Sequence, residues 1–173
     1  MGLGKKAAAL DKESLWAYAL RSLGARALSA GEVRVKLRAR AADPADIEPT
    51  LSRLKEYGYL NDERFAESYA VARRDNQGFG RFRVLQDLRK RRVAGTVAEK
   101  ASASAFAGVD ETAQALAFVE RKFRGKDLSE EKYLASAYRR LRAAGFGSGA
   151  AIAALKRFNA RAEEIEEVEE TEE

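Results

Sequence analysis

Apolar residues recur along the chain at intervals of three and four, and this pattern marks nine amphipathic segments. The first segment, KESLWAYALRSLG, reaches Gly24, a residue type that commonly follows the end of a helix. The nine segments form three successive groups of three. Prolines are scarce, and Ala, Leu, Arg, Lys and Glu are abundant, which favours helix throughout. The pattern therefore predicts an all-α protein.

Start and stop signals place the first three helices. Ser29 and Glu32 have the spacing of a capping box, in which each side chain accepts a hydrogen bond from the backbone of the other residue. Pro44 falls in the first turn of the third segment, and Gly58 follows its last apolar residue. The residues expected to face the core of this group are Leu15, Trp16, Ala19, Leu20, Leu23, Val33, Leu37, Ala41, Ile47, Leu51 and Leu54.

The second and third groups show the same helical spacing. Asn61 or Asp62 is expected to cap the first helix of the second group. Its inward residues are predicted to be Phe65, Ala66, Tyr69, Ala70, Phe82, Val84, Leu85, Leu88, Val97, Ala98, Ala101 and Ala105. Those of the third group are predicted to be Ala113, Leu116, Ala117, Phe123, Tyr133, Leu134, Ala137, Tyr138, Leu141, Ile152 and Leu155.

The middle segments of the three groups align with one another. Leu37, Leu88 and Leu141 occupy matching positions, 51 and then 53 residues apart. Because one three-helix unit has only a marginal core, tandem copies are expected to contact one another in an elongated array that can curve with a right-handed sense. The predicted organisation is an N-terminal extension at 1–11, repeats at 12–60, 61–107 and 108–160, and an acidic tail at 161–173.

Composition narrows the possible chemistry. The chain has no cysteine and no histidine, which removes disulfides, thiolate nucleophiles, imidazole bases and the usual zinc ligands. Glu63 and Glu67 lie one helical turn apart, but such pairs are usually surface charges. We therefore expect no enzyme, no cofactor and no metal site. No apolar run approaches the roughly 18 residues of a membrane span, so no membrane contact and a cytoplasmic location are expected.

Charge is strongly segregated along the chain. Residues 163–173 contain eight glutamates and no base, which leaves 19 of the 27 acids and all 32 bases, a net charge of +13, in residues 1–162. A basic body of this kind attracts polyanions or acidic protein surfaces. The tail either confers solubility, which is the usual role of such runs, or competes for the basic body.

The densest basic stretch is GFGRFRVLQDLRKRR, residues 78–92. Residues 73–92 hold eight bases and two acids, which favours a docking surface for an anionic partner over a merely solvated helix face. A helical projection places Arg83 and Lys90 at the centre of the polar face, while Arg92 lies where a cation stabilises the helix end. The candidate docking residues are Arg73, Arg74, Arg81, Arg83, Arg89, Lys90, Arg91, Arg139 and Arg142.

Other conspicuous residues receive structural interpretations. Gly78 and Gly80 are expected to turn the chain, because GFG lacks the strand and the full glycine signature of a nucleotide-binding loop. Trp16 is expected at the edge of the core, and Tyr57 and Tyr59 are expected to join the first two repeats. A solvated face is expected for Arg34, Lys36, Arg38 and Arg40.

Three phrases in this order, LWAYALRSLGARALSAGEVRVKLRAR, LKEYGYLNDERFAESYAVARR and GRFRVLQDLRKRRV, resemble the RecX family of regulators of the RecA recombinase. The resemblance covers residues 15–158, and the third repeat matches mostly through RRLRAAGF. Asn61 stands where the family more often has an acid, although either residue caps a helix.

The resemblance implies an elongated monomer of three three-helix repeats that binds in the groove of RecA filaments on DNA. Such binding would inhibit ATP hydrolysis, strand exchange and filament extension, and so control recombination, DNA repair and the SOS response. The implied partners are the RecA filament and the DNA phosphate backbone. An alternative is a stand-alone DNA-binding protein, because three-helix units also resemble helix-turn-helix domains.

Overall fold

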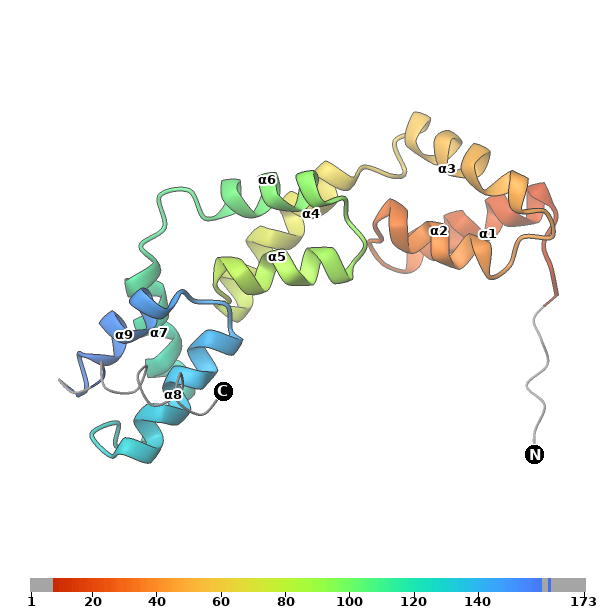
Figure 1. Ribbon diagram of the computed structural model, residues 1–173. Coiled ribbons are helices and arrows are strands. Elements are labelled where there is room, and N and C mark those ends of the chain that lie inside the picture. Colours follow the sequence, from red (N-terminus) through yellow and green to blue (C-terminus); the bar gives the residue numbers. More distant parts are fainter. Residues whose placement is uncertain (1–7, 160–161, 163–173) are drawn as a thin grey trace, which may run out of the picture.

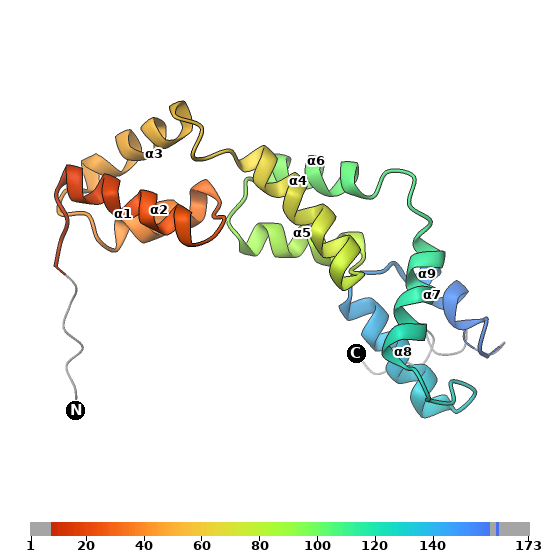
Figure 2. The same ribbon diagram turned by 180° about the vertical axis from the view of Figure 1, so that it is seen from behind.

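The computed structural model describes residues 8–159 and residue 162, and this part of the chain contains helices and turns but no strand. Its nine α-helices form three units arranged one after another along an elongated, bent molecule (Figures 1 and 2). The all-α class and the array of three-helix repeats are confirmed. The predicted tail lies outside the described residues, except for Ala162.

The first unit contains α1 (Lys12–Ala25), α2 (Ala30–Arg38) and α3 (Ile47–Glu56). The predicted capping box forms, with the Glu32 N–H donating to Ser29 Oγ at 3.1 Å and the Ser29 N–H donating to Glu32 Oε2 at 3.1 Å. Gly58 follows α3 with a φ of +73°, as its position predicts. Gly24 differs from the prediction, because α1 continues through it to Ala25 before the chain becomes extended.

The second unit contains α4 (Asp62–Ala72), a π-helical turn (Arg73–Gln77), α5 (Arg81–Lys90) and α6 (Gly95–Ala105). Asn61 caps α4 by accepting from the Arg64 N–H at 2.9 Å. Val84 and Leu88 of α5 are buried as predicted. Phe82 is 56% exposed on the outer side of α5. The prediction that Phe82 supports the core is therefore wrong.

The third unit contains α7 (Glu111–Lys122), α8 (Glu131–Ala143) and α9 (Ser148–Leu155). The α8 prediction is confirmed for Leu134, Ala137, Tyr138 and Leu141, which are buried. The prediction for α7 is partly confirmed, because Leu116 and Phe123 pack against the core, but it is wrong for the two alanines. Ala113 and Ala117 are exposed, and the buried residues are Ala115, Phe118 and Val119. Phe118 packs edge-on against Phe146, and burial of these large rings decides the face because alanines gain little from either environment.

Each unit has its own hydrophobic core, so each buries its apolar residues mainly among its own three helices. Phe79 is an exception, because it packs against the cores of both the second and the third unit. This residue precedes α5 and therefore helps to fix the direction in which the array continues.

The middle helices of the first two units meet end to end. The Ser29 hydroxyl, at the N-terminus of α2, donates to the carbonyl oxygen of Arg91, which follows α5. The Ala30 N–H donates to the Asp62 carboxylate at 2.7 Å, so a residue of the second unit caps a helix of the first. A carboxylate at this position also interacts favourably with the positive end of the α2 dipole.

The second and third units form a similar joint. The N-terminus of α5 meets the C-terminal end of α8, where the Gly80 N–H donates to the Ala144 carbonyl at 2.9 Å and the Phe82 N–H donates to the Gly145 carbonyl at 3.2 Å. Gly80 is a site of close packing as well as a turn, because a Cβ atom there would overlap the Gly145 carbonyl. The helices α8, α5 and α2 therefore lie head to tail. The negative C-terminal end of one helix dipole faces the positive N-terminal end of the next, which is a favourable arrangement.

Candidate docking surface

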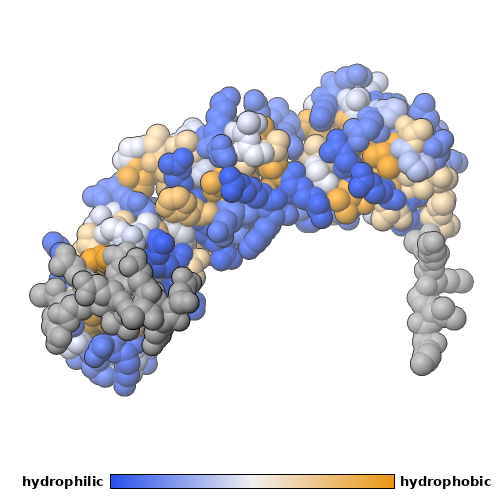
Figure 3. Space-filling view, viewed as in Figure 1, coloured by the Kyte–Doolittle hydropathy of each residue, from blue (hydrophilic) through white to orange (hydrophobic). Residues whose placement is uncertain are grey.

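The basic stretch of the second unit presents a charged outer face along α5. In the space-filling view, hydrophilic side chains dominate the surface over the middle of the array (Figure 3). The exposed residues of α5 are Arg81, Phe82, Gln86, Arg89 and Lys90. Cations and one aromatic ring are thus displayed together on a helix held at both ends by neighbouring units.

A cation on this face is available to bind a partner if its side chain forms no ion pair, or only a weak exposed one, within the protein. In the described part of the chain, the Arg81 and Lys90 side chains form no ion pair. Arg89 pairs with Glu99 at 3.0 Å, but both side chains are more than half exposed. Exposed pairs of this kind contribute little and exchange readily for another anion.

Arg91 is engaged inside the protein. Its Nε lies 2.9 Å from Glu32 Oε1, and its Nη2 donates to the Ala27 carbonyl at 2.9 Å. Its guanidinium also lies over the rings of Phe65 and Tyr69, at 5.2 and 5.4 Å from their centroids. Arg91 therefore joins the first two units, a role that the sequence pattern did not indicate.

Arg83 has a comparable role at the second joint. It pairs with Asp87 at 3.1 Å, and its Nη1 donates to the Ala143 carbonyl at 3.3 Å. Its backbone packs against Gly145. The sequence places Arg83 at the centre of the docking face, but the structure directs it toward the third unit.

Arg73 and Arg74 lie in the π-helical turn. The Arg73 guanidinium stacks over Tyr69 at 4.8 Å, and Arg74 donates to the Ala105 carbonyl and pairs with Asp75 at 2.7 Å. The hydrogen bond from Arg74 holds the pKa of the Asp75 carboxyl below its usual value. Both arginines therefore support the second unit.

The two candidates in the third unit are both exposed on α8. The Arg142 side chain donates to the Phe146 carbonyl at 2.8 Å, which satisfies a carbonyl just beyond the end of the helix. Arg139 lies one turn earlier on α8, and it also has a partner within the protein. Of the candidate docking residues, those that remain available, Arg81, Arg89 and Lys90, therefore all lie on α5.

The first unit carries an exposed aromatic cluster. The ring centroids of Trp16, Tyr57 and Tyr59 lie 6.0 to 6.4 Å apart, and the Arg53 guanidinium lies 4.1 Å from the Trp16 centroid. Tyr57 and Tyr59 are 64% and 55% exposed, and both rings pack against Trp16 of the first unit. Tyr59 also lines a cavity shared with the second unit, but the polar contacts that join the two repeats come from Arg91 and Ser29.

The predicted solvated face of α2 is partly engaged. Arg34 forms a two-point pair with Glu48, with distances of 2.7 and 3.0 Å. This contact holds the pKa of the Glu48 carboxyl below its usual value. The Arg40 guanidinium and the Lys36 ammonium both lie over the Tyr18 ring. Of these four cations, only Arg38 has neither an ion pair nor a ring contact among the described residues.

Two kinds of site are absent from the described residues. Within them, no group of three or more acidic side chains could hold a metal ion. No helix in this part of the chain is long and apolar enough to cross a membrane. The features that stand out are surface charge, exposed rings and a cavity between the first two units.

Comparisons with known proteins agree with this architecture. The family described as "RecX, first three-helix domain" matches residues 16–54, and "RecX, second three-helix domain" matches residues 61–101. Regulatory protein RecX of Deinococcus radiodurans is 35% identical over 148 residues, which are 84% of this chain and 69% of that protein. Regulatory protein RecX of Trichlorobacter lovleyi is 33% identical over 63% of this chain and 71% of its own length.

Solved structures show the same fold. The crystal structure of RecX from Lactobacillus salivarius superposes with a TM-score of 0.70 and 17% identity, over 86% of this chain and 97% of that one. A second crystal structure of a regulatory protein RecX superposes with a TM-score of 0.70 and 18% sequence identity. The superposition covers 80% of this chain and 70% of that one. The fold and surface define a helical-repeat protein with exposed cations and aromatic rings. The chain belongs to the RecX family of regulatory proteins.

Proposed function

We propose that this protein binds RecA filaments on DNA and inhibits their ATP hydrolysis, strand exchange and extension. The observation that carries the proposal is the continuous array of three repeats, which presents an exposed cationic helix at its centre and belongs to a regulatory family. An elongated body can touch several protomers of a filament at once. Simultaneous contacts increase the overall affinity without requiring a strong individual site.

The available cations suit an acidic protein surface or a phosphate backbone. Arg81, Arg89 and Lys90 supply charge without a fixed binding geometry, which favours fast, salt-dependent association. We infer that α5 contacts the filament and that bound protein resists the movement of protomers needed for turnover.

The alternative, a stand-alone helix-turn-helix protein, receives less support. In such domains the third helix commonly enters the major groove. The third helix of the second unit, α6, carries a single cation, Lys100, and α9 carries none. On α5, Gln86 is the one exposed amide available to read base edges.

Cosedimentation separates these two functions. The protein is incubated with RecA filaments on single-stranded DNA, with the same DNA alone, and with duplex DNA of varied sequence. We expect it to pellet with the filament at concentrations where DNA alone retains little of it. Equal retention on DNA without RecA, or sequence-selective protection of duplex DNA, would instead support the alternative.

A further inference from the structure

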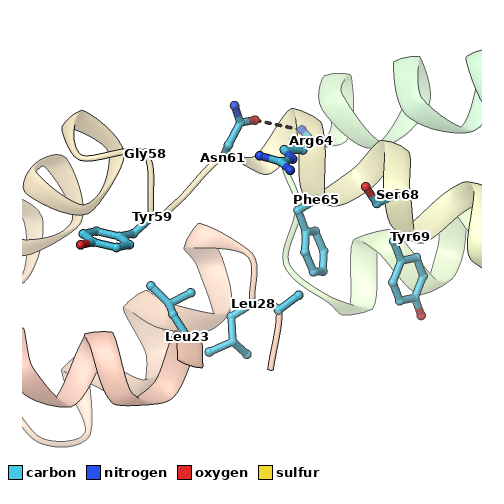
Figure 4. Close-up of a pocket in the computed structure, with 10 residues that line it drawn as sticks. Leu23, Leu28, Gly58, Tyr59, Asn61, Arg64, Phe65, Ser68 and Tyr69 are labelled. Atoms are coloured by element: carbon cyan, nitrogen blue, oxygen red, sulfur yellow. Dashed lines mark hydrogen bonds between the residues drawn. The ribbon is translucent and has the colours of Figure 1, made fainter. Parts of the chain in front are cut away.

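A cavity of about 430 Å³ lies between the first and second units. Figure 4 shows Phe65 and Tyr69 projecting from α4 on one side of it and Leu23 and Leu28 on the other. Tyr59 borders it from the linker between the units and is 55% exposed. The cavity is thus lined by aromatic and aliphatic groups and is open to the outside.

The polar groups at its rim are able to donate hydrogen bonds. They are the guanidinium of Arg64, the amide of Asn61 and the hydroxyls of Ser68 and the two tyrosines. None of the residues that line the cavity is acidic. Arg64 is exposed, and its side chain has no ion pair in the described part of the chain. A ligand that presents hydrogen-bond acceptors and negative charge complements this rim.

The walls are held in place before any ligand arrives. Asp62 caps α2 across the joint, and Arg91 donates to the Ala27 carbonyl and lies over Phe65 and Tyr69. These contacts connect both walls of the cavity through one set of polar interactions across the joint. A preformed site costs less ordering on binding than a flexible one.

We propose that this cavity binds a bulky apolar side chain carried on an acidic segment of a partner protein. The apolar side chain fills the space among Leu28, Phe65 and Tyr69, and neighbouring carboxylates accept hydrogen bonds from Arg64 and Asn61. Anchors of this type, a large side chain in a pocket with a polar rim, commonly dominate protein–protein binding. The proposal rests on the proposed function, in which the partner is a RecA protomer of the filament.

A nucleic acid strand fits this site less well. Single strands are bound by a row of cations that follows the phosphates beside aromatic platforms. Only one cation, Arg64, lines this cavity. Arg91 lies over Phe65 and Tyr69 but is not a lining residue, and it contacts Glu32 and a backbone carbonyl. Leu23 and Leu28 line the side opposite α4, and leucine side chains offer no flat surface for base stacking.

Site-specific photocrosslinking tests the identity of the occupant. A photoreactive phenylalanine analogue replaces Tyr59 in the full chain, which is then bound to RecA filaments on single-stranded DNA. The expected product joins position 59 to a RecA segment that contains an apolar residue flanked by Asp or Glu. Crosslinks to DNA, or to a RecA segment without acidic residues, would overturn the proposal.

Inhibition of RecA by the unmodified protein is measured in parallel. If that protein inhibits and position 59 yields no crosslink, the cavity proposal fails while the proposed function stands. If the unmodified protein neither binds nor inhibits filaments, the proposed function itself fails.

A pair of substitutions on α4 tests the cavity by filling it. Ser68→Trp places a large ring in the cavity and is expected to weaken filament binding by about tenfold or more. Glu67→Trp is the matched control, because Glu67 is exposed on the same helix but does not line the cavity. Equal affinities for the two variants would contradict the proposal. Arg64→Glu provides a second test if Ser68→Trp unfolds, and it should weaken binding while preserving the melting temperature.

Discussion

Gly31 lies so close to Arg92 that a Cβ atom on Gly31 would overlap the Arg92 carbonyl oxygen. Arg92 has a φ of +59°, in the left-handed region, where it ends the last turn of α5. Gly145 has the same position after α8, with a φ of +90°, and a Cβ there would overlap the backbone nitrogen of Arg83. At both joints, a residue with left-handed backbone angles follows the helix and places its end against the start of the next helix.

Replacing Gly31 by alanine is expected to lower the free energy of unfolding by about 1–3 kcal/mol, because the added methyl meets backbone that cannot rotate away. Urea unfolding followed by circular dichroism measures the change. Gly24→Ala is the control, since Gly24 lies within α1 with no neighbour within 4 Å of a Cβ atom. It should raise stability by up to about 1 kcal/mol. A similar loss in both variants would contradict this description of the joint.

Arg91→Met should lower the free energy of unfolding by about 1.5–3 kcal/mol, because Glu32 loses an ion-pair partner and the Ala27 carbonyl loses a charged donor. Methionine keeps much of the length of the side chain. Arg89→Met, which removes only an exposed pair with Glu99, should change stability by no more than about 0.5 kcal/mol. Equal effects in parallel urea titrations would show that Arg91 does not support the joint.

Reversing the available charges on α5 should separate docking from stability. The double variant Arg81→Glu and Lys90→Glu is expected to weaken binding to RecA filaments by about tenfold or more, with an unchanged circular dichroism spectrum. Binding is measured by fluorescence anisotropy at several salt concentrations. Lys12→Glu with Lys122→Glu makes the same change in net charge on exposed residues elsewhere. If this control binds as weakly, overall charge rather than α5 determines the affinity.

The pair of Arg34 and Glu48 predicts a pH dependence of stability. Because its folded pKa is held below the ordinary value of 4.5, the Glu48 carboxylate stabilises the fold above that pH, and this contribution is lost as the pH falls through the folded pKa. Glu48→Gln should therefore be less stable than the wild type at neutral pH, and the difference should shrink in acid. A difference that stays constant across pH would exclude this contribution, which solvent exposure keeps small.

The sequence was sufficient to predict much of the fold. Capping signals at Ser29 and Asn61 and the aligned leucines of α2, α5 and α8 are local or periodic features, so they can be read without tertiary information. On alanine-rich α7 the prediction is right for Leu116 but wrong for Ala113 and Ala117, because the polar and apolar sides of this helix differ little until Phe118 meets Phe146. Phe82 was misplaced because a helical period does not reveal which unit covers the edge of a helix.

The candidate surface was harder to predict than the fold. A count of bases cannot separate an arginine that extends into solvent from one whose partner is distant in the sequence. Arg91 contacts Ala27, and Arg83 contacts Ala143, across joints that appear only in three dimensions. The cavity was equally hidden, because its walls come from two repeats.

RecA ATPase activity on single-stranded DNA, measured as this protein is added up to stoichiometric amounts, tests the central claim most directly. The account predicts progressive inhibition by the wild type, and much weaker inhibition by the variant with Arg81→Glu and Lys90→Glu at the same concentration. An unchanged ATPase rate at stoichiometric wild-type protein would contradict it.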